Sequence, residues 1–225
     1  MITTVLLDVD NTLLDFNRCA AGAMKSAFAE WDLAYEDRVL PAFHEINDQL
    51  WEQIEQGRLT KDTLHQVRWQ KIFDRLGIRR SGADFEITFL KYMAESYQPV
   101  EGAGRLLEYL YPKYTLCIVS NASHHQQMNR LEKAGFLKYF KYVFTSEQIG
   151  CPKPGRKFFS ACLSQLGDPP KESVIIIGDS LSADIRGGRE SGIQTCWYHH
   201  SGAAAEQNDA ADYTVGTLAE IEQIL

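Results

Sequence analysis

The spacing of apolar residues changes along the chain and predicts two kinds of structure. Residues 4–7 form a short apolar run that is typical of a buried strand, which we expect to extend over residues 3–10. From about residue 18 to residue 97, apolar side chains such as Phe43, Ile46 and Leu50 recur three or four positions apart. This period places them on one face of a helix. The pattern therefore predicts a helical insertion directly after the first strand.

After residue 98, short apolar runs alternate with helical segments. The predicted strands are residues 114–120, 142–145, 173–177, 194–198 and 213–215, and the predicted helices include residues 103–111, 126–134 and 157–166. Such alternation predicts right-handed crossovers and a parallel sheet covered on both faces. The expected fold class is α/β: a doubly wound, Rossmann-like sheet of residues 1–15 and 98–225, with an all-helical domain inserted at residues 16–97. Residues 203–207 are expected to form a surface loop or a short helix.

Composition narrows the class of protein further. A chain of 225 residues with 44% apolar residues can build one large domain with a smaller inserted one. Its net charge of −7, with no basic stripe to offset it, argues against a nucleic-acid partner. Five cysteines without Cys-x-x-Cys spacing indicate reduced, mostly buried thiols. No apolar run approaches membrane-spanning length and no leader precedes the first strand, so we expect a cytoplasmic protein without a membrane partner, as a monomer or homodimer.

The first predicted strand ends in two aspartates, Asp8 and Asp10. Side chains alternate along a strand, so both carboxylates point the same way and Val9 points into the core. Two neighbouring carboxylates repel each other unless one is protonated or a cation lies between them. A hard divalent cation prefers oxygen ligands. The pair therefore predicts a Mg²⁺ site, and Mn²⁺ fits it equally well.

Further polar residues follow the later strands or lie near their ends. They are Ser120 and Asn121, the loop lysine Lys153 between two prolines, and Asp179 and Asp184. In a parallel sheet the carboxyl ends of the strands share one edge, so these residues can converge there. A carboxylate nucleophile, a cation site, a hydroxyl donor and a lysine charge are together suited to phosphoryl transfer.

Plainer interpretations exist for each motif. Asp8 and Asp10 also fit a solvated loop, Asp179 and Asp184 fit a turn with a helix cap, and Lys153 fits a surface position. Four motifs in order are more specific than any one alone, so chemistry is favoured. Two non-enzyme alternatives stay open: a receiver-like phosphoryl acceptor, although receivers lack such a large insertion, and an inactive homologue that only binds a ligand.

This set of motifs resembles the haloacid dehalogenase superfamily of aspartate-nucleophile phosphatases, over the whole chain. The resemblance implies that the helical insertion is a cap domain. It implies that Asp8 is the nucleophile and that Asp10 is the general acid/base. Ser120 and Lys153 match catalytic phosphate-binding positions, and Asn121 is expected to bind phosphate beside them.

The same resemblance implies a set of metal ligands. Mg²⁺ would be held by the carboxylates of Asp8 and Asp179 and by the backbone carbonyl of Asp10. Asp184 would support Lys153 or a metal-bound water. Dehalogenases of this superfamily lack the second aspartate of the first motif, so Asp10 favours phosphate chemistry.

A finer similarity is to the pyrimidine 5′-nucleotidase branch. It rests on residues 8–16 (DVDNTLLDF), 178–188 (GDSLSADIRGG), 192–198 (GIQTCWY) and the cap segment 50–60. It implies a Mg²⁺-dependent phosphomonoester hydrolase that forms an aspartyl-phosphate and acts on a small substrate, a pyrimidine nucleoside monophosphate such as UMP, dUMP or dTMP. A sugar-phosphate phosphatase and a β-phosphoglucomutase-like phosphotransferase remain alternatives, since they use the same aspartate pair.

The cap is expected to supply substrate specificity, with hinges near residues 15–16 and 99–102. Trp51, Arg68 and Trp69 are candidate contacts, because aromatic rings stack on bases and guanidinium groups bind oxygens. Trp51 and Trp69 fit a role in the hydrophobic core equally well. The adjacent histidines His199 and His200 share neither a helical nor a strand face, so we expect surface or supporting roles for them.

Overall fold

The computed structural model describes residues 1–199 and 209–225, which form two compact units. The sheet unit consists of Met1–Phe16 and Tyr97–Leu225, and the helical unit consists of Asn17–Ser96. The boundaries expected from the sequence, after residues 15 and 97, lie within one residue of these. His200, expected in a surface or supporting role, lies outside the described residues, and so do residues 203–207, expected to form a surface loop or a short helix.

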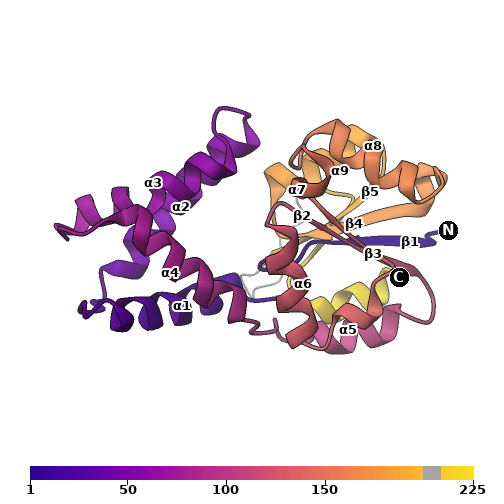
Figure 1. Cartoon of the computed structure of the whole chain (residues 1–225). Helices are drawn as coiled ribbons and strands as arrows, with labels where there is room; N and C mark the ends of the chain where they lie inside the picture. Colours follow the sequence, from indigo (N-terminus) through magenta and orange to yellow (C-terminus); the bar gives the residue numbers. More distant parts are fainter. Residues whose placement is uncertain (200–208) are drawn as a thin grey trace. The chain divides into compact units, whose positions relative to one another are not determined.

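The sheet unit contains a six-stranded parallel sheet (Figure 1). Its strands are β1 (Thr4–Leu7), β2 (Thr115–Ser120), β3 (Tyr142–Thr145), β4 (Val174–Gly178), β5 (Gln194–Tyr198) and β6 (Tyr213–Val215). The strand order is β3-β2-β1-β4-β5-β6, and all neighbours are parallel. Since β1 pairs with β2 on one side and β4 on the other, its carboxyl end lies in the middle of one sheet edge. The predicted doubly wound α/β fold is confirmed.

The first strand is shorter than the sequence suggested. It ends at Leu7, and the chain then turns, because the carbonyl of Val9 accepts hydrogen bonds from the N–H groups of Leu13 and Leu14, both at 2.9 Å. Asp8 and Asp10 therefore lie beyond the strand rather than inside it. Val9 is fully buried, as predicted.

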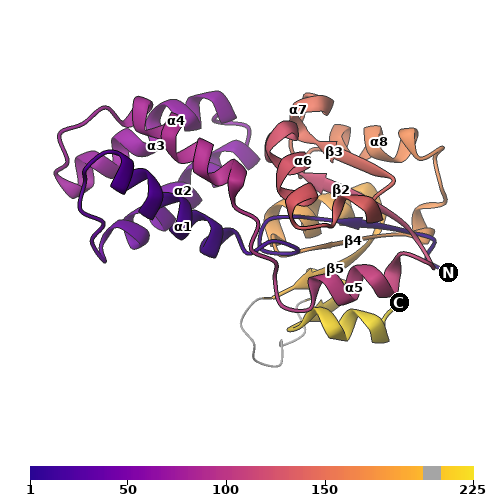
Figure 2. The ribbon, with the colours of Figure 1, turned by 60° about the horizontal axis from the view of Figure 1, so that its bottom comes forward.

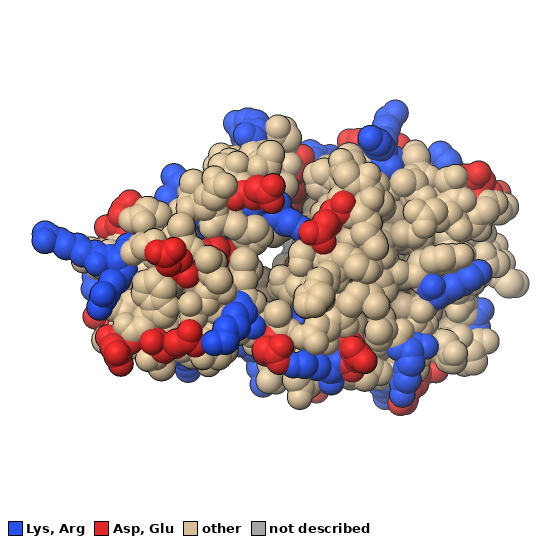
Figure 3. All heavy atoms as spheres, in the orientation of Figure 1, with Lys and Arg blue, Asp and Glu red and all other residues tan. Residues whose placement is uncertain are grey.

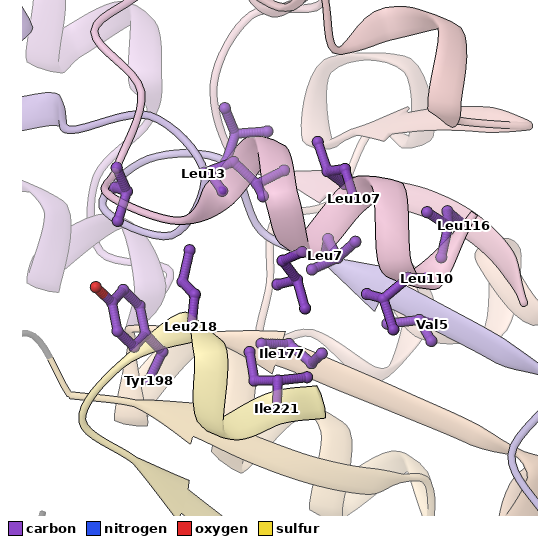
Figure 4. Close-up of a cluster of buried hydrophobic side chains, with 14 of the residues drawn as sticks. Val5, Leu7, Leu13, Leu107, Leu110, Leu116, Ile177, Tyr198, Leu218 and Ile221 are labelled. Atoms are coloured by element: carbon purple, nitrogen blue, oxygen red, sulfur yellow. The ribbon is translucent and has the colours of Figure 1, made fainter. Parts of the chain in front are cut away.

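Helices cover both faces of the sheet (Figures 1 and 2). They are α5 (Ala103–Leu110), α6 (His124–Lys133), α7 (Ser146–Ile149), α8 (Arg156–Gln165) and α9 (Arg186–Ser191), with 3-10 helices at Leu137–Tyr139, Lys171–Ser173 and Leu218–Gln223 and a π-helical turn at Leu181–Ile185. Alternate residues of each strand face opposite ways. Val5 and Leu7 of β1 therefore pack with α5 and the last 3-10 helix (Figure 4), whereas Leu6 packs with α8 on the other face.

The chain leaves and re-enters the sheet unit through two adjacent segments. The N–H of Asp15 donates to the carbonyl of Gln98 at 2.8 Å, and the N–H of Val100 donates to the carbonyl of Leu13 at 3.0 Å. These hydrogen bonds hold the two segments side by side at the positions where the sequence predicts hinges.

The helical unit has a core of aromatic side chains. Its helices are α1 (Phe16–Glu30), whose first residue belongs to the sheet unit, α2 (Val39–Glu55), α3 (Lys61–Leu76) and α4 (Gly82–Glu95). The core rings are Phe28, Phe43, Trp69, Phe73, Phe85 and Phe89, mostly in edge-to-face or tilted contacts. The side chain of Thr60 caps the start of α3 by accepting a hydrogen bond from the N–H of Thr63.

The distribution of surface charges and the state of the cysteines are as expected from the composition. Acidic and basic side chains are interspersed on the face seen in Figure 3. Over the described residues, the helices are too short or too polar to cross a membrane. All five cysteines are free and four of them are buried. Burial raises the pKa of the thiols of Cys117, Cys162 and Cys196 to about 12, so they stay protonated.

Candidate active site

Asp8 follows β1 directly and is bound to Lys153. Its Oδ1 accepts a hydrogen bond from Nζ of Lys153 at 2.7 Å. The same ammonium donates to Oδ1 of Asp184 at 2.6 Å and to the carbonyl of Val119 at 2.8 Å. An ammonium has three hydrogens to donate, so all of them are used. Lys153, which is 2% exposed, is therefore fixed among its partners rather than lying on the surface.

The backbone of Lys153 is held by Asn121, at the end of β2. Oδ1 of Asn121 accepts from the N–H of Lys153, and Nδ2 donates to its carbonyl. Both ends of the carboxamide of Asn121 thus contact the backbone of Lys153. The contact of Asn121 with phosphate expected from the sequence stays a prediction.

Asp184 is brought to the site by a close approach of the π-helical turn to β4. Its Oδ2 accepts from the N–H of Ser180 at 3.2 Å, while its Oδ1 binds Lys153. A Cβ on Gly178 would lie 2.2 Å from Oδ2 of Asp184, so only glycine allows this approach. Asp179 lies between Gly178 and Ser180 in the sequence. Its backbone carbonyl accepts a hydrogen bond from the indole Nε1 of Trp197 at 2.8 Å.

Three carboxylates share this edge of the sheet. Those of Asp8, Asp179 and Asp184 can place ligand oxygens within 4.8 Å of one another. Burial raises the pKa of Asp8 to about 7; Lys153 opposes the rise, and Asp184 and Asp10 add to it. Burial, with Asp8 and Asp184, also raises the pKa of Asp179 well above its usual range. Burial alone would lower the pKa of Lys153, but Asp184 and Asp8 outweigh it and raise that pKa.

This excess of negative charge fits a divalent cation. One ammonium cannot balance three neighbouring carboxylates, two of them buried, and hard oxygen donors are the ligands that Mg²⁺ prefers. Both oxygens of Asp184 already accept hydrogen bonds, from Lys153 and from Ser180. The carboxylates of Asp8 and Asp179 are therefore the better candidates for metal ligands, which leaves Asp184 in the supporting role predicted for it.

Asp10 belongs to a different group of side chains. Its Oδ1 accepts from Nη1 of Arg130 at 2.6 Å, and its Oδ2 accepts from Nε2 of Gln127 at 2.7 Å. Nε2 of Gln127 also donates to Oγ of Ser120 at 3.0 Å. The acid/base candidate and the hydroxyl candidate are thus connected through one amide. The carboxylate of Asp10 is directed to this network, and a metal contact from its backbone carbonyl stays a prediction.

Gln127 and Arg130 were not among the residues predicted from the sequence. Both lie on α6 and are fully buried. A sequence signal did exist, because polar residues three positions apart share a helical face, and Leu131 beside them is buried. That spacing does not reveal which residue on another element they would meet.

The comparison with protein families decides the class of protein. The family model described as haloacid dehalogenase-like hydrolase matches residues 5–198. The chain belongs to the haloacid dehalogenase-like hydrolases. This confirms the family inferred from the motifs, and it makes the chain an enzyme.

Relatives of this haloacid dehalogenase-like hydrolase cover almost its full length. It is 32% identical to the HAD-hydrolase YfnB of Bacillus subtilis, over 99% of this chain and 94% of the relative. A crystal structure of YfnB bound to magnesium matches it with a TM-score of 0.92 and 31% identity, over 99% of this chain and 98% of that one. It is also 34% identical to the pyrimidine 5′-nucleotidase PynA of Streptococcus pneumoniae, over 87% of this chain and 84% of the relative. It shares 28% identity with the pyrimidine 5′-nucleotidase YjjG of Escherichia coli, over 98% of this chain and 96% of the relative.

Two of the three cap residues proposed as substrate contacts of this hydrolase have structural roles. Nη2 and Nε of Arg68 donate to Glu86 at 2.5 and 3.2 Å, and Nη1 donates to Asn47 at 2.9 Å. Arg68 is 3% exposed, so its guanidinium is used inside the helical unit and the predicted substrate contact is wrong. Trp69 is fully buried among the aromatic rings, which bears out the core alternative. Trp51 is half-buried in α2, and its contact with substrate stays a prediction.

Proposed function

We propose that this hydrolase removes the phosphate of pyrimidine nucleoside 5′-monophosphates, in a Mg²⁺-dependent reaction that passes through a phosphorylated Asp8. The observation that carries the proposal is the separation of two neighbouring aspartates into different networks. Asp8 is held by Lys153, whereas Asp10 is held by Arg130 and Gln127. One carboxylate can then attack phosphorus while the other transfers protons.

In the first step a carboxylate oxygen of Asp8 attacks phosphorus and a new P–O bond forms. The ester P–O bond breaks, and the leaving oxygen takes a proton from the carboxyl group of Asp10 to become the nucleoside 5′-hydroxyl. Lys153 and the hydroxyl of Ser120 offset the negative charge on the phosphoryl oxygens.

In the second step the carboxylate of Asp10 takes a proton from water, and the water oxygen attacks the phosphorus of the aspartyl-phosphate. The P–O bond to Asp8 breaks, which releases inorganic phosphate and restores the carboxylate of Asp8. Asp10 is again protonated, so the cycle is balanced. Lys153 stays beside Asp8 in both steps and stabilises the departing carboxylate.

Asp8 and Asp179 would hold the Mg²⁺ ion through carboxylate oxygens, with the backbone carbonyl of Asp10 as a further ligand, and Mn²⁺ fits the same donors. When bound, the cation supplies positive charge that offsets charge developing on the phosphoryl group. The proposal is supported by the burial and the crowding of carboxylates, which raise the pKa of Asp8 and Asp179, and by the magnesium in the crystal structure of YfnB.

The substrate class is supported by the relatives PynA and YjjG, both of which are named pyrimidine 5′-nucleotidases. Asp10 adds a chemical reason for a phosphate ester. A nucleoside 5′-alkoxide is a poor leaving group and needs a proton, which Asp10 can supply.

The test is phosphate release from UMP, dUMP, dTMP, AMP, glucose 6-phosphate and p-nitrophenyl phosphate, with Mg²⁺ and then with EDTA. Asp8→Asn is the matched control, because it keeps the size of the side chain and removes the nucleophilic carboxylate. We expect Mg²⁺-dependent release from the pyrimidine nucleotides, absent in the variant. Release from glucose 6-phosphate alone would overturn the substrate class, and release that persists in Asp8→Asn would overturn the mechanism.

A further inference from the structure

A chain of hydrogen bonds connects α6 to both the hydroxyl and the acid/base of the site. Nη1 of Arg130 donates to Oδ1 of Asp10 and, at 3.2 Å, to Oε1 of Gln127. Nε2 of Gln127 donates to Oδ2 of Asp10 and to Oγ of Ser120. Arg130 and Gln127 thus connect the carboxylate of Asp10, the proposed acid/base, with the hydroxyl of Ser120, the proposed donor to the phosphoryl group.

The chemistry of each group fixes the direction of every bond in this chain. A guanidinium group only donates and an ionised carboxylate only accepts. Gln127 must therefore turn Oε1 toward Arg130 and its NH₂ group toward Asp10. The two hydrogens of that NH₂ group then serve Asp10 and Ser120, so the amide cannot flip without losing its bonds to Arg130 and Asp10.

This direction determines what Ser120 can do. Its Oγ accepts from Nε2 of Gln127 at 3.0 Å and from the N–H of Ala122 at 3.1 Å. Those two bonds use both lone pairs of the oxygen, and the hydroxyl hydrogen remains to be donated. Ser120 is thereby prepared as a donor to a negatively charged oxygen.

Asp10 is held but not used up by these bonds. Each of its carboxylate oxygens accepts one hydrogen bond from α6 and has a second lone pair. Its side chain is 26% exposed, whereas that of Arg130 is 0% exposed. Burying a guanidinium group is costly unless it is paired, so Arg130 ties the position of Asp10 to the fold.

We propose that Gln127 and Arg130 are positioning residues that aim the hydroxyl of Ser120 at the phosphoryl group and hold Asp10 in place for proton transfer to the leaving oxygen. This inference rests on the proposed phosphomonoester hydrolysis and adds two residues to it. It gives α6 a catalytic purpose beyond covering the sheet.

Leaving groups of different basicity test the part played by Arg130. A nitrophenolate departs without a proton, whereas a nucleoside 5′-alkoxide needs one, and kcat/KM reports the first irreversible step. We expect Arg130→Gln to lower kcat/KM for UMP by about 10- to 100-fold, as for a displaced general acid, and to change that for p-nitrophenyl phosphate by less than about threefold. A merely structural role would lower both values together.

Gln127→Glu tests the orientation of Ser120, because it keeps an acceptor for Arg130 and removes both donors. We expect the inhibition constant of inorganic phosphate to rise by about tenfold, which corresponds to the free energy of one hydrogen bond to a charged group.

Arg130→Lys should recover part of the activity on UMP that Arg130→Gln loses, because it retains a cationic donor. In an Asp10→Asn background, Arg130→Gln should have little further effect on UMP, since its target is gone. The exposed Glu132→Gln on the same helix is the control and should match wild type.

Equal losses on both substrates, or unchanged values in Arg130→Gln and Gln127→Glu variants with a wild-type melting temperature, would overturn the inference while the proposed function stands. A rise in kcat/KM for UMP in Arg130→Gln would also overturn it, because Arg130 would then hold Asp10 in an unproductive position. If wild type released phosphate from neither UMP nor p-nitrophenyl phosphate, the proposed function itself would fall, and this inference with it.

Discussion

The side-chain amide of Asn121 forms two hydrogen bonds with the backbone of Lys153: its Oδ1 accepts from the N–H at 2.8 Å, and its Nδ2 donates to the carbonyl at 3.0 Å. The two residues lie 32 positions apart, at the end of β2 and in the loop before α8. Because the backbone is fixed there, the ammonium of Lys153 donates one hydrogen each to Asp8 and Asp184 and the third to the carbonyl of Val119. The neighbouring amide thus helps to place the ammonium group of Lys153 between the two carboxylates.

Replacing Asn121 with alanine should therefore impair catalysis without touching a charged group. A displacement of about 1 Å in a catalytic group can cost about 100-fold in rate. We expect kcat/KM of Asn121→Ala to fall by about 10- to 100-fold and the free energy of unfolding by about 1–3 kcal/mol. Steady-state kinetics and urea denaturation measure the two effects. Wild-type kinetics in this variant would show that Lys153 is positioned by other contacts.

Gly178→Ala should damage the site through a steric clash. The added Cβ would lie 2.2 Å from Oδ2 of Asp184, so either β4 or Asp184 must move. We expect a loss of about 1–3 kcal/mol in unfolding free energy, typical of overpacking, together with most of the activity.

Gly22→Ala in α1 is the matched control for this clash. A Cβ there would have no atom within 4 Å, and alanine favours a helix over glycine by about 0.5–1 kcal/mol. Gly22→Ala should thus keep full activity and be slightly stabilised. A stable, fully active Gly178→Ala protein would contradict the geometry around Asp184.

The buried ion pair of Arg68 and Glu86 predicts a stability effect in the helical unit. Arg68→Met leaves the buried Glu86 with His65, whose Nδ1 lies at 2.8 Å, in place of its arginine, and breaking a buried ion pair typically costs about 3–5 kcal/mol. The double variant Arg68→Met with Glu86→Leu should recover much of this loss, because it removes both charges. Chemical denaturation of the two variants and wild type measures the difference. A selective rise in KM for UMP, with unchanged stability, would instead restore Arg68 as a substrate contact.

The raised pKa of Asp8 predicts how the metal-free protein responds to pH. Asp8 titrates near pH 7 in the folded chain and near its ordinary value of 3.8 when unfolded. Between these values the folded state binds more protons, so the unfolding free energy must fall as pH rises. Asp179, whose pKa is also raised, acts in the same direction.

In EDTA we therefore expect stability to decrease from pH 5 to pH 7.5, by at most about 1.4 kcal/mol per pH unit for each group. Mg²⁺ should remove most of the loss at the upper end, because a bound cation favours the ionised carboxylates. Melting temperatures across this range measure the slope, and Asp8→Asn should flatten it. A metal-free wild type that grows more stable over this range would contradict the raised pKa values.

The sequence alone determined the alternation of strands and helices and the order of the motifs. Five of the six strands lie within about one residue of their predicted bounds. They could be predicted because a short apolar run is a local signal that can be read from consecutive residues. It also indicated that Asp8, Lys153, Asp179 and Asp184 could converge, because the carboxyl ends of parallel strands share an edge. The first strand was predicted too long, since an apolar run does not reveal the turn at Val9.

Only the tertiary structure decided which side chains meet. Asp10 binds Gln127 and Arg130 across 117 and 120 positions of sequence. Helical spacing shows that two residues share a face, but the packing of α6 against the sheet selects the carboxylate that they bind. The same holds for Arg68, whose guanidinium is equally suited to a substrate or to Glu86. Burial decides between them, because a charge removed from water must be paired within the fold.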